Sequence, residues 1–174
     1  YNIESNIFCF TYIGQLIKRK RILETINLLT KTAKKNNIKI LFMIAGQGDL
    51  CKEINDLLIK NKFLDYKIFP HINETKLSEI YTISDSLILL SRNEPWGMVI
   101  NEAMIHNLAF LTTDKVEAAN YYKSEYKKST VLNYKDITEE TIYQHMKLSK
   151  KRFKKLISPI DPKEMADKFI EKIK

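Results

Sequence analysis

The chain is predicted to form one α/β domain over residues 1–174: a doubly wound, Rossmann-like parallel sheet of about six strands, with helices on both faces and further helices at the C-terminus. Three observations predict this fold. Strand-like and helix-like segments alternate along the chain, as in repeated βαβ units. The strand-like segments are mostly continuous apolar runs, which suits strands buried on both faces. The connections are short, and crossovers of this kind are right-handed.

In the first half of the chain, β-rich runs alternate with amphipathic stretches. The expected strands are "IFCFTYIG", "IKILFMIAG" and "YKIFPHI", at residues 7–14, 38–46 and 66–72. The first helix carries apolar residues at helical spacing from Ile22 to Ala33. The second is expected to run from Asp49, as its cap, to about Ile59, and the third covers residues 74–83.

The second half continues the alternation up to a helical tail. Strands are expected at residues 86–91, 109–113 and 130–134. A helix over residues 98–106 joins the first two of these strands, and a weaker helix joins the last two. From Thr138 onward the pattern is mostly helical, with breaks at Pro159 and Pro162.

The composition is that of an ordinary soluble globular protein, with 44% hydrophobic and 29% charged residues. The longest apolar runs are too short to cross a bilayer, and the amino terminus does not resemble a signal peptide. Cys9 and Cys51 fall in a strand and a helix without metal-ligand spacing, so we expect reduced cysteines in a cytoplasmic protein. The net charge of +8 would suit nucleic acid, an anionic membrane or a phosphorylated small molecule, and by itself it does not choose among them.

In a doubly wound sheet, ligands bind at the carboxyl ends of the strands. This rule selects Gly14-Gln15, Gly46-Gln47-Gly48, Pro70-His71 and residues 91–97. The pair Gly46 and Gly48 fits either a nucleotide-binding turn or a tight turn with a positive φ angle. A dinucleotide fingerprint would need a small residue where Cys51 stands, and it would follow the first strand, so an NAD-binding domain is not expected.

The segment "GQLIKRKR" places four cations, residues 18–21, beside the start of a helix. Cations at that position oppose the helix dipole unless an anion is bound nearby. A phosphate would remove this conflict, because helix amides and lysine side chains would then face the same charge. A solvated helix start is the alternative interpretation.

Two carboxylates, Glu94 and Glu102, stand where a buried strand runs into a buried helix. Pro95 and Gly97 predict a turn after Glu94, and the helix starts near Met98 with Glu102 one turn further on. A partly buried carboxylate needs hydrogen-bond donors, and it can accept from two adjacent sugar hydroxyls at once. The alternative is that both are surface carboxylates. A metal site is less favoured, because the chain has no Asp-x-Asp and no clustered histidines.

These segments resemble a known family. "EPWGMVINEAM" resembles the Glu-x7-Glu motif of family 4 glycosyltransferases, which are retaining enzymes of GT-B architecture. "YIGQLIKRKRILETI" is similar to the family's Gly-Arg-Leu-x-x-x-Lys segment, and "LFMIAGQGDL" to its strand with Gly-x-Gly. "IFPHINETKLSEIYTISDSLILLS" is similar to the segment that leads to the motif. Four segments in the right order make the resemblance specific.

The resemblance implies a role for each matching residue. Glu94 would accept hydroxyls of the donor sugar, Glu102 would accept those of the nucleotide ribose, and Lys20 would bind the diphosphate. The amides of Gly97, Met98 and Val99 would hold the distal phosphate. The remaining residues implied to line the donor site are Gly14, Gln15, Arg19, Pro95 and Trp96, with His71 and Ile72 beside the base and Gly46 and Gly48 leaving room for the nucleotide.

The chain also departs from the family's pattern. Gln15 stands where the family has a phosphate-binding arginine, a loss of charge for which Lys18 or Arg19 could compensate. Asn107, Ala109 and His71 replace a common glycine, proline and glycine, which we interpret as turn variation. The resemblance covers only the C-terminal, donor-binding half of the two-domain enzymes, so the N-terminal acceptor domain is expected to be missing from this chain.

The resemblance therefore implies a retaining hexosyltransferase that moves a sugar from a nucleotide diphosphate to a glycan or lipid-linked acceptor. No cofactor, metal or nucleic acid is expected to take part, and the chain alone is expected to be inactive. The basic run at residues 150–155 is interpreted as a solvated helix face, or as a contact with an anionic membrane at its inner, cytoplasmic side. A nucleotide-binding or regulatory module without turnover is the alternative function.

Overall fold

The computed structural model describes residue 4 and residues 6–152, and it contains a six-stranded sheet in which all strands are parallel. The strand order is β3-β2-β1-β4-β5-β6. This is the order of a doubly wound dinucleotide-type fold, and it confirms the predicted fold class. The strands are β1 Ile7–Ile13, β2 Lys39–Ala45, β3 Asp65–Phe69, β4 Ser86–Leu89, β5 Ala109–Thr113 and β6 Ser129–Leu132.

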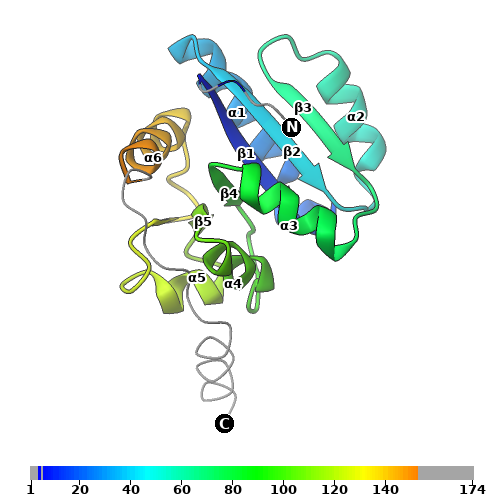
Figure 1. Cartoon of the computed structure of the whole chain (residues 1–174). Helices are drawn as coiled ribbons and strands as arrows, with labels where there is room; N and C mark the ends of the chain where they lie inside the picture. The colour runs from blue at the N-terminus through cyan, green and yellow to red at the C-terminus, as the bar shows by residue number, and fades with distance from the viewer. Residues whose placement is uncertain (1–3, 5, 153–174) are drawn as a thin grey trace.

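Helices cover both faces of the sheet. Figure 1 shows α3 in front of the strands and α1 and α2 behind them, with α4 and α5 beside β4 and β5. A short 3₁₀ helix, η1, precedes α1. The helices are η1 Lys18–Lys20, α1 Ile22–Asn36, α2 Cys51–Ile59, α3 Glu74–Ile83, α4 Met98–Ile105, α5 Glu117–Tyr122 and α6 Glu139–Arg152.

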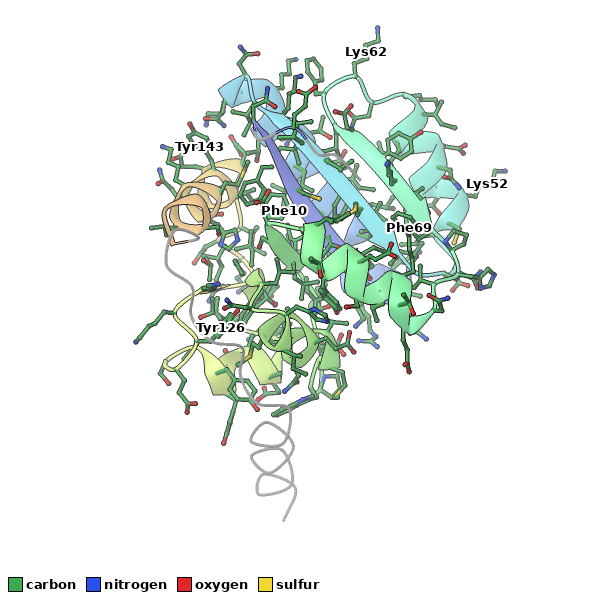
Figure 2. The ribbon with its side chains drawn as sticks, in the orientation of Figure 1. Phe10, Lys52, Lys62, Phe69, Tyr126 and Tyr143 are labelled. Carbon is green, nitrogen blue, oxygen red and sulfur yellow. The ribbon has the colours of Figure 1, made fainter. Side chains whose placement is uncertain are left out.

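Alternation along β1 explains how both faces of the sheet are buried. Phe8, Phe10 and Tyr12 point to one face and belong to a large apolar cluster, whereas Cys9 points to the other and packs with Ile80 of α3. Phe10 and Tyr126 lie within the protein, while Lys52 extends outward from α2 (Figure 2). Because every residue of β1 from Phe8 to Tyr12 is buried, the continuous apolar run is what this central strand requires.

Most predicted elements agree with the structure, and the third helix and the strand at 109–113 agree at both ends. The prediction of Asp49 as a helix cap is wrong. Leu50 occupies the cap position of α2, and no side chain caps that helix. The third strand ends at Phe69 rather than at residue 72, and Pro70 follows it directly. Its last ladder bond runs from the amide of Gly46 to the carbonyl of Phe69 at 3.0 Å.

The tail predicted to be helical from Thr138 begins as α6, and His145 ties this helix to the sheet. The buried His145 ring contacts Ser86 of β4 through Nε2 and Thr130 of β6 through Nδ1, both at 2.7 Å. Pro159, Pro162 and the side chains of the basic run at 150–155 lie outside the described residues. Within the described part of the chain, no helix is long and apolar enough to span a bilayer.

The two cysteines lie where the sequence places them. Cys9 is in β1 and is buried, and Cys51 is the first residue of α2 and is half-buried. Neither takes part in a disulfide bond within the described chain.

Candidate functional site

The strand order has its switch point between β1 and β4. The chain leaves β1 toward β2 on one side and reaches β4 on the other side, so the strand order reverses at this point. Ligands of doubly wound sheets bind outside the carboxyl ends of the strands at such a switch point. The loop from Gly14 to Arg21 and the segment at residues 90–97 follow those two strand ends. They are the two predicted segments with the most charge.

The loop after β1 is held by a bond from the strand beneath it. The hydroxyl of Tyr12 donates to the carbonyl of Gln15 at 2.6 Å, which holds the loop immediately after Gly14. Gly14 has a φ angle of 145°, a conformation that favours glycine. Leu16 is buried as an apolar anchor, while the side chain of Gln15 is exposed. The loop is therefore anchored to the domain by Tyr12 and Leu16, and its Gln15 side chain faces solvent.

Two cations of the loop after β1 converge on one carboxylate of the segment at residues 90–97. Nζ of Lys20 is paired with Oε2 of Glu94, and Nη1 of Arg19 lies 3.4 Å from the same oxygen. Lys20 and Glu94 are only 8% and 9% exposed, whereas the Arg19 side chain is 44% exposed. The structure thus brings together three predicted site residues that are 74 and 75 positions apart in the sequence.

Backbone contacts hold the two loops together at the same place. Nη1 of Arg19 donates to the carbonyl of Asn93 at 2.9 Å, and the amide of Arg92 donates to the carbonyl of Arg19 at 2.9 Å. The carboxylate of Glu94 also acts on Tyr12. Burial first, and then the charge of Glu94, raises the pKa of the Tyr12 hydroxyl, so it stays protonated and remains a donor.

The turn before α4 is built around Gly97. This residue has a φ angle of 90° and is the N-terminal cap of α4, with no side-chain capping bond. A Cβ atom there would lie 2.9 Å from Cγ1 of Val116 and 3.2 Å from Cγ of Glu94, so only glycine fits. Met98, the first residue of α4, is 57% exposed. Gly97 itself is buried, and the positive end of the helix dipole lies at this turn, next to the exposed Met98.

The loop before α5 supports this turn from the other side. The amide of Glu94 donates to the carbonyl of Lys115, and the amide of Ala118 donates to the carbonyl of Trp96, both at 2.9 Å. Nε1 of Trp96 donates to Oδ1 of Asn101 at 2.9 Å, and its ring packs near Tyr121. The indole of Trp96, which we expected in the donor site, therefore serves the packing of α4 against α5. The side chain of Pro95 is exposed at the turn.

Glu102 lies one turn into α4 and has a partner that the sequence did not reveal. The hydroxyl of Tyr81, in α3, donates to Oε2 of Glu102 at 2.6 Å. Tyr81 is 1% exposed, while Glu102 is half-buried. Glu94 is thus bound by the cations of Lys20 and Arg19, whereas Glu102 is bound by a neutral hydroxyl.

The two glycines after β2, Gly46 and Gly48, are required by close contacts with the neighbouring loop after β1. A Cβ atom on Gly46 would lie 1.9 Å from the carbonyl oxygen of Gly14, and one on Gly48 would lie 2.4 Å from that of Leu16. The two loops are joined by a bond of 2.8 Å from the amide of Leu16 to the carbonyl of Gln47. The space that a side chain would need here is filled by the neighbouring loop. Of the two interpretations, the tight turn describes Gly46, whose φ angle is 147°.

His71 and Ile72 follow β3 and lie at the same edge of the sheet. Nε2 of Gln47 lies 2.7 Å from Nε2 of His71, so the loops after β2 and β3 meet through these side chains. His71, Ile72 and the first turns of α3 enclose an open cavity of about 460 Å³, whose other lining residues are Asn73, Thr75, Lys76 and Glu79. This cavity lies beside the residues expected to flank a base.

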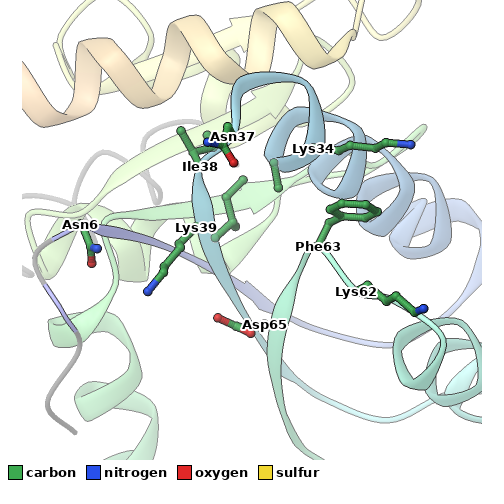
Figure 3. Close-up of a pocket in the computed structure, with 10 residues that line it drawn as sticks. Asn6, Lys34, Asn37, Ile38, Lys39, Lys62, Phe63 and Asp65 are labelled. Atoms are coloured by element: carbon green, nitrogen blue, oxygen red, sulfur yellow. The ribbon is translucent and has the colours of Figure 1, made fainter.

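A larger cavity of about 630 Å³ lies at the opposite edge of the sheet, where β2 and β3 begin. Its lining includes Lys34, Lys39, Lys62, Phe63 and Asp65. Figure 3 shows that the three lysines point in different directions, and Lys34 lies over the ring of Phe63. These charges do not converge on one ligand. The switch point therefore remains the candidate site, because its charges do converge.

A family comparison identifies the chain. The family described as glycosyl transferases group 1 matches residues 1–158. The chain belongs to this family. Among the described residues there is no group of three or more His, Cys, Asp or Glu side chains arranged to hold a metal ion.

Relatives of this group 1 glycosyltransferase chain include a glycogen synthase of Mycoplasma mobile, 25% identical over 158 residues. The match covers 87% of the chain and 33% of that protein, so the chain spans about a third of the relative's length. A mutant of TarM from S. aureus, solved with Fondaparinux, alpha-GlcNAc-glycerol and UDP, is similar over 98% of the chain and 37% of its own, with a TM-score of 0.69 and 16% identity. WaaG, a glycosyltransferase involved in lipopolysaccharide biosynthesis, is similar over 85% and 39%, with a TM-score of 0.65 and 20% identity.

These solved structures support the group 1 glycosyltransferase fold. Sequence reasoning missed two tyrosines of the candidate site in this domain, Tyr12 and Tyr81. Tyr12 was visible only as the last aromatic residue of a buried strand, and Tyr81 only as a helical residue of a segment quoted for its resemblance. Their hydroxyls reach Gln15 and Glu102, which no local pattern predicts.

Proposed function

We propose that the chain is the donor-binding domain of a two-domain, retaining family 4 glycosyltransferase of GT-B architecture. It binds a nucleotide diphosphate sugar, and the complete enzyme transfers the sugar to a glycan or lipid-linked acceptor. One observation carries the proposal. Lys20 and Arg19 meet Glu94 at the switch point of the sheet, beside the N-terminal end of α4, which has no side-chain capping bond. Cations, helix amides and a hydroxyl acceptor are the groups that a sugar diphosphate needs.

The diphosphate is the anion that these groups suit. The amides of Gly97, Met98 and Val99 and the ammonium of Lys20 supply positive charge that is fixed before the ligand arrives. Negative charge develops on the leaving diphosphate during transfer, so fixed donors lower the barrier when they bind it more tightly in the transition state. In this proposal Lys20 and Arg19 supply the positive charge that a metal ion would supply in other transferases.

Glu94 can serve the sugar while it remains paired. Its ion pairs with Lys20 and Arg19 both use Oε2. In the part of the chain that the structure describes, Oε1 of Glu94 has no hydrogen-bond partner, so it is open to donor-sugar hydroxyls. The ion pair then holds the carboxylate in place while the sugar binds. Arg19, the more exposed of the two cations, takes the place of the charge that Gln15 lacks.

The acceptor is assigned to a domain outside this chain. A glycan acceptor is consistent with the named relatives, a glycogen synthase and a lipopolysaccharide glycosyltransferase. The UDP bound in the TarM complex makes UDP a suitable first probe of the donor site. A lipid-linked acceptor would place the enzyme at the cytoplasmic face of a membrane, where the basic run at residues 150–155 would meet anionic lipid.

Calorimetric titration of the chain with UDP, ADP and GDP, and with UDP-glucose, ADP-glucose and GDP-mannose, tests the donor assignment. We expect one diphosphate to bind, and its sugar-linked form to bind more tightly. Glu94→Gln keeps the side-chain shape but weakens the acceptor for sugar hydroxyls, so it should remove the preference for the sugar-linked form. Glu53→Gln, on the exposed face of α2, is the matched control and should keep that preference.

The outcomes separate the two functions. Binding of a diphosphate without any preference for its sugar-linked form would favour a nucleotide-binding module without turnover. Absence of binding to all six compounds would contradict the donor assignment. Retention is tested separately, by NMR determination of the anomeric configuration of the first product formed by the complete enzyme.

A further inference from the structure

One hydrogen bond joins the helices that flank the proposed ribose position. The hydroxyl of Tyr81, in α3, donates to Oε2 of Glu102, in α4, at 2.6 Å. These residues are 21 positions apart in the sequence, and α3 and α4 lie on the same side of the sheet (Figure 1). The bond is short and one partner is a carboxylate, so it belongs to the stronger class of hydrogen bonds.

Tyr81 is held firmly enough to fix what it contacts. Its side chain is 1% exposed, and its ring stacks on the ring of His106 with centroids 4.9 Å apart and an angle of 17° between the planes. Burial first, and then the charge of Glu102, raises the pKa of Tyr81, so its hydroxyl stays protonated and always acts as the donor. The amide of His106 also donates to the carbonyl of Glu102 at 3.1 Å. The Tyr81 ring is therefore packed against the same turn of α4 that carries Glu102.

This contact leaves most of the carboxylate open. An ionised carboxylate has about four acceptor positions on two oxygens, and Tyr81 occupies one of them. Oε1 of Glu102 accepts no hydrogen bond from residue 4 or residues 6–152. Glu102 is half-buried, and its Oε1 is not among the fully buried side-chain atoms without a partner in the described part of the chain, while Oε2 is held by Tyr81. A carboxylate held in this way can accept from two neighbouring hydroxyls without first losing side-chain freedom.

We propose that Tyr81 is a positioning residue that holds Glu102 in the orientation needed to accept the two adjacent ribose hydroxyls of the bound nucleotide. The inference rests on the proposed function, because it assumes that a nucleotide ribose lies at Glu102. An exposed glutamate would have to be ordered on binding, which lowers affinity. Tyr81 orders the carboxylate beforehand. The contribution of Tyr81 to nucleotide affinity should therefore depend on the ribose hydroxyls and disappear for a nucleotide that lacks one of the pair.

Calorimetric titration of the chain with UDP and with 2′-deoxy-UDP tests this dependence. The wild-type chain is expected to bind UDP more tightly than 2′-deoxy-UDP. Tyr81→Phe removes only the hydroxyl and keeps the buried, stacked ring. It should weaken UDP binding about tenfold, in line with loss of one well-placed bond to a charged group, and leave 2′-deoxy-UDP binding unchanged. A purely structural role would weaken the binding of both nucleotides equally.

Two further variants give the test its controls. Tyr126→Phe removes another buried tyrosine hydroxyl, which donates to the carbonyl of Leu108 at 2.8 Å, and it should leave the UDP preference intact. Glu102→Gln should itself remove the preference, and adding Tyr81→Phe to Glu102→Gln should then have little further effect. This non-additivity is the signature of action through Glu102.

The results also separate this inference from the proposed function. If UDP binds more tightly than 2′-deoxy-UDP in both the wild type and Tyr81→Phe, by the same ratio, the positioning role is wrong and the donor assignment stands. If the chain binds no nucleoside diphosphate, both fail together. If UDP binds but Glu102→Gln does not change the ratio, the ribose does not lie at Glu102, and the inference about Tyr81 is overturned.

Discussion

Glu94 and Glu102 belong to one loop-and-helix unit, yet the protein holds them by different chemistry. Glu94 is 9% exposed, and its Oε2 faces the cations of Lys20 and Arg19. Glu102 is half-buried, and its Oε2 accepts from the neutral hydroxyl of Tyr81. Each therefore has one oxygen engaged by the protein and one oxygen open to a ligand.

The difference follows from burial. A carboxylate removed from water needs a countercharge, because its desolvation is costly and a neutral donor offsets only part of it. A half-exposed carboxylate keeps some contact with water, and one neutral donor is enough to fix its direction. Glu94 is consequently part of the framework as well as of the candidate site, and its cation cannot be removed without cost to the fold. Glu102 has no such cation, so its partner can be removed at a smaller cost to the fold.

The largest expected effect comes from breaking the pair at Glu94. Lys20→Met keeps the side-chain volume but leaves a buried carboxylate with only Arg19 beside it. We expect unfolding in urea to show a loss of about 3 kcal/mol, the usual cost of removing one partner of a buried pair. We also expect turnover of the complete enzyme to fall by about 10²–10³, because a fixed cation at the diphosphate is lost.

A double variant separates these two effects. Lys20→Met combined with Glu94→Gln leaves no unpaired buried charge, so most of the lost stability should return while turnover stays low. Lys52→Ala, on the exposed face of α2, should change neither quantity. Normal turnover in Lys20→Met would remove Lys20 from the proposed mechanism, whatever the stability shows.

A smaller effect is expected at the exposed cation of the same pair. Arg19→Gln should weaken binding of UDP to the chain about tenfold, as expected for one charged hydrogen bond. Because the Arg19 side chain is 44% exposed, the loss should shrink as salt is raised. Gln15 is exposed on the same loop, so Gln15→Arg in the Arg19→Gln background should restore binding. Failure of that restoration would mean that Arg19 acts by holding the carbonyl of Asn93 instead.

Much of this architecture could be predicted from the sequence. The run at 38–46 is apolar except for Lys39, and the run at 109–113 is apolar up to its two threonines. Such runs between amphipathic stretches favour a parallel sheet. The strand order brings together loops that are 74 residues apart, and the rule on strand ends already selected both. Glu94 lies on the second of these loops, whereas Lys20 and Arg19 follow Gly14-Gln15 on the first and were implied by the family resemblance.

What the sequence could not predict was the partner of each group. That Lys20 pairs with Glu94 depends on the separation of two loops, which periodicity does not encode. The hydroxyl of Tyr81 reaches Glu102 because α3 and α4 pack on one face, and Tyr81 itself reads as an ordinary apolar helix position. For Gly46 and Gly48 the sequence left a nucleotide-binding turn and a tight turn both open, and it did not predict that the backbone of Gly14 and Leu16 lies against them.

A third carboxylate shows whether burial, and not the number of cations, decides the cost of breaking a pair. Glu24, in α1, resembles Glu94 in having two cationic partners, which are Arg21 and Arg92. Unlike Glu94, its side chain is 42% exposed. Burial alone would raise the pKa of Glu24, but Arg21 and then Arg92 outweigh it, so its pKa lies below the ordinary value of 4.5.

The sign of the effect at Glu24 follows from that lowered pKa. Both the folded and the unfolded chain carry the charge above pH 4.5, and there the ion pairs contribute fully to stability. As the pH falls through the folded-state pKa, the carboxylate becomes protonated and the contribution disappears. Glu24→Gln should therefore lower the urea midpoint slightly at pH 7 and not at all well below that pKa, with Glu53→Gln as control. An effect at pH 7 as large as that of Lys20→Met would show that exposure does not set the cost, and the contrast between buried and exposed pairs would have to be abandoned.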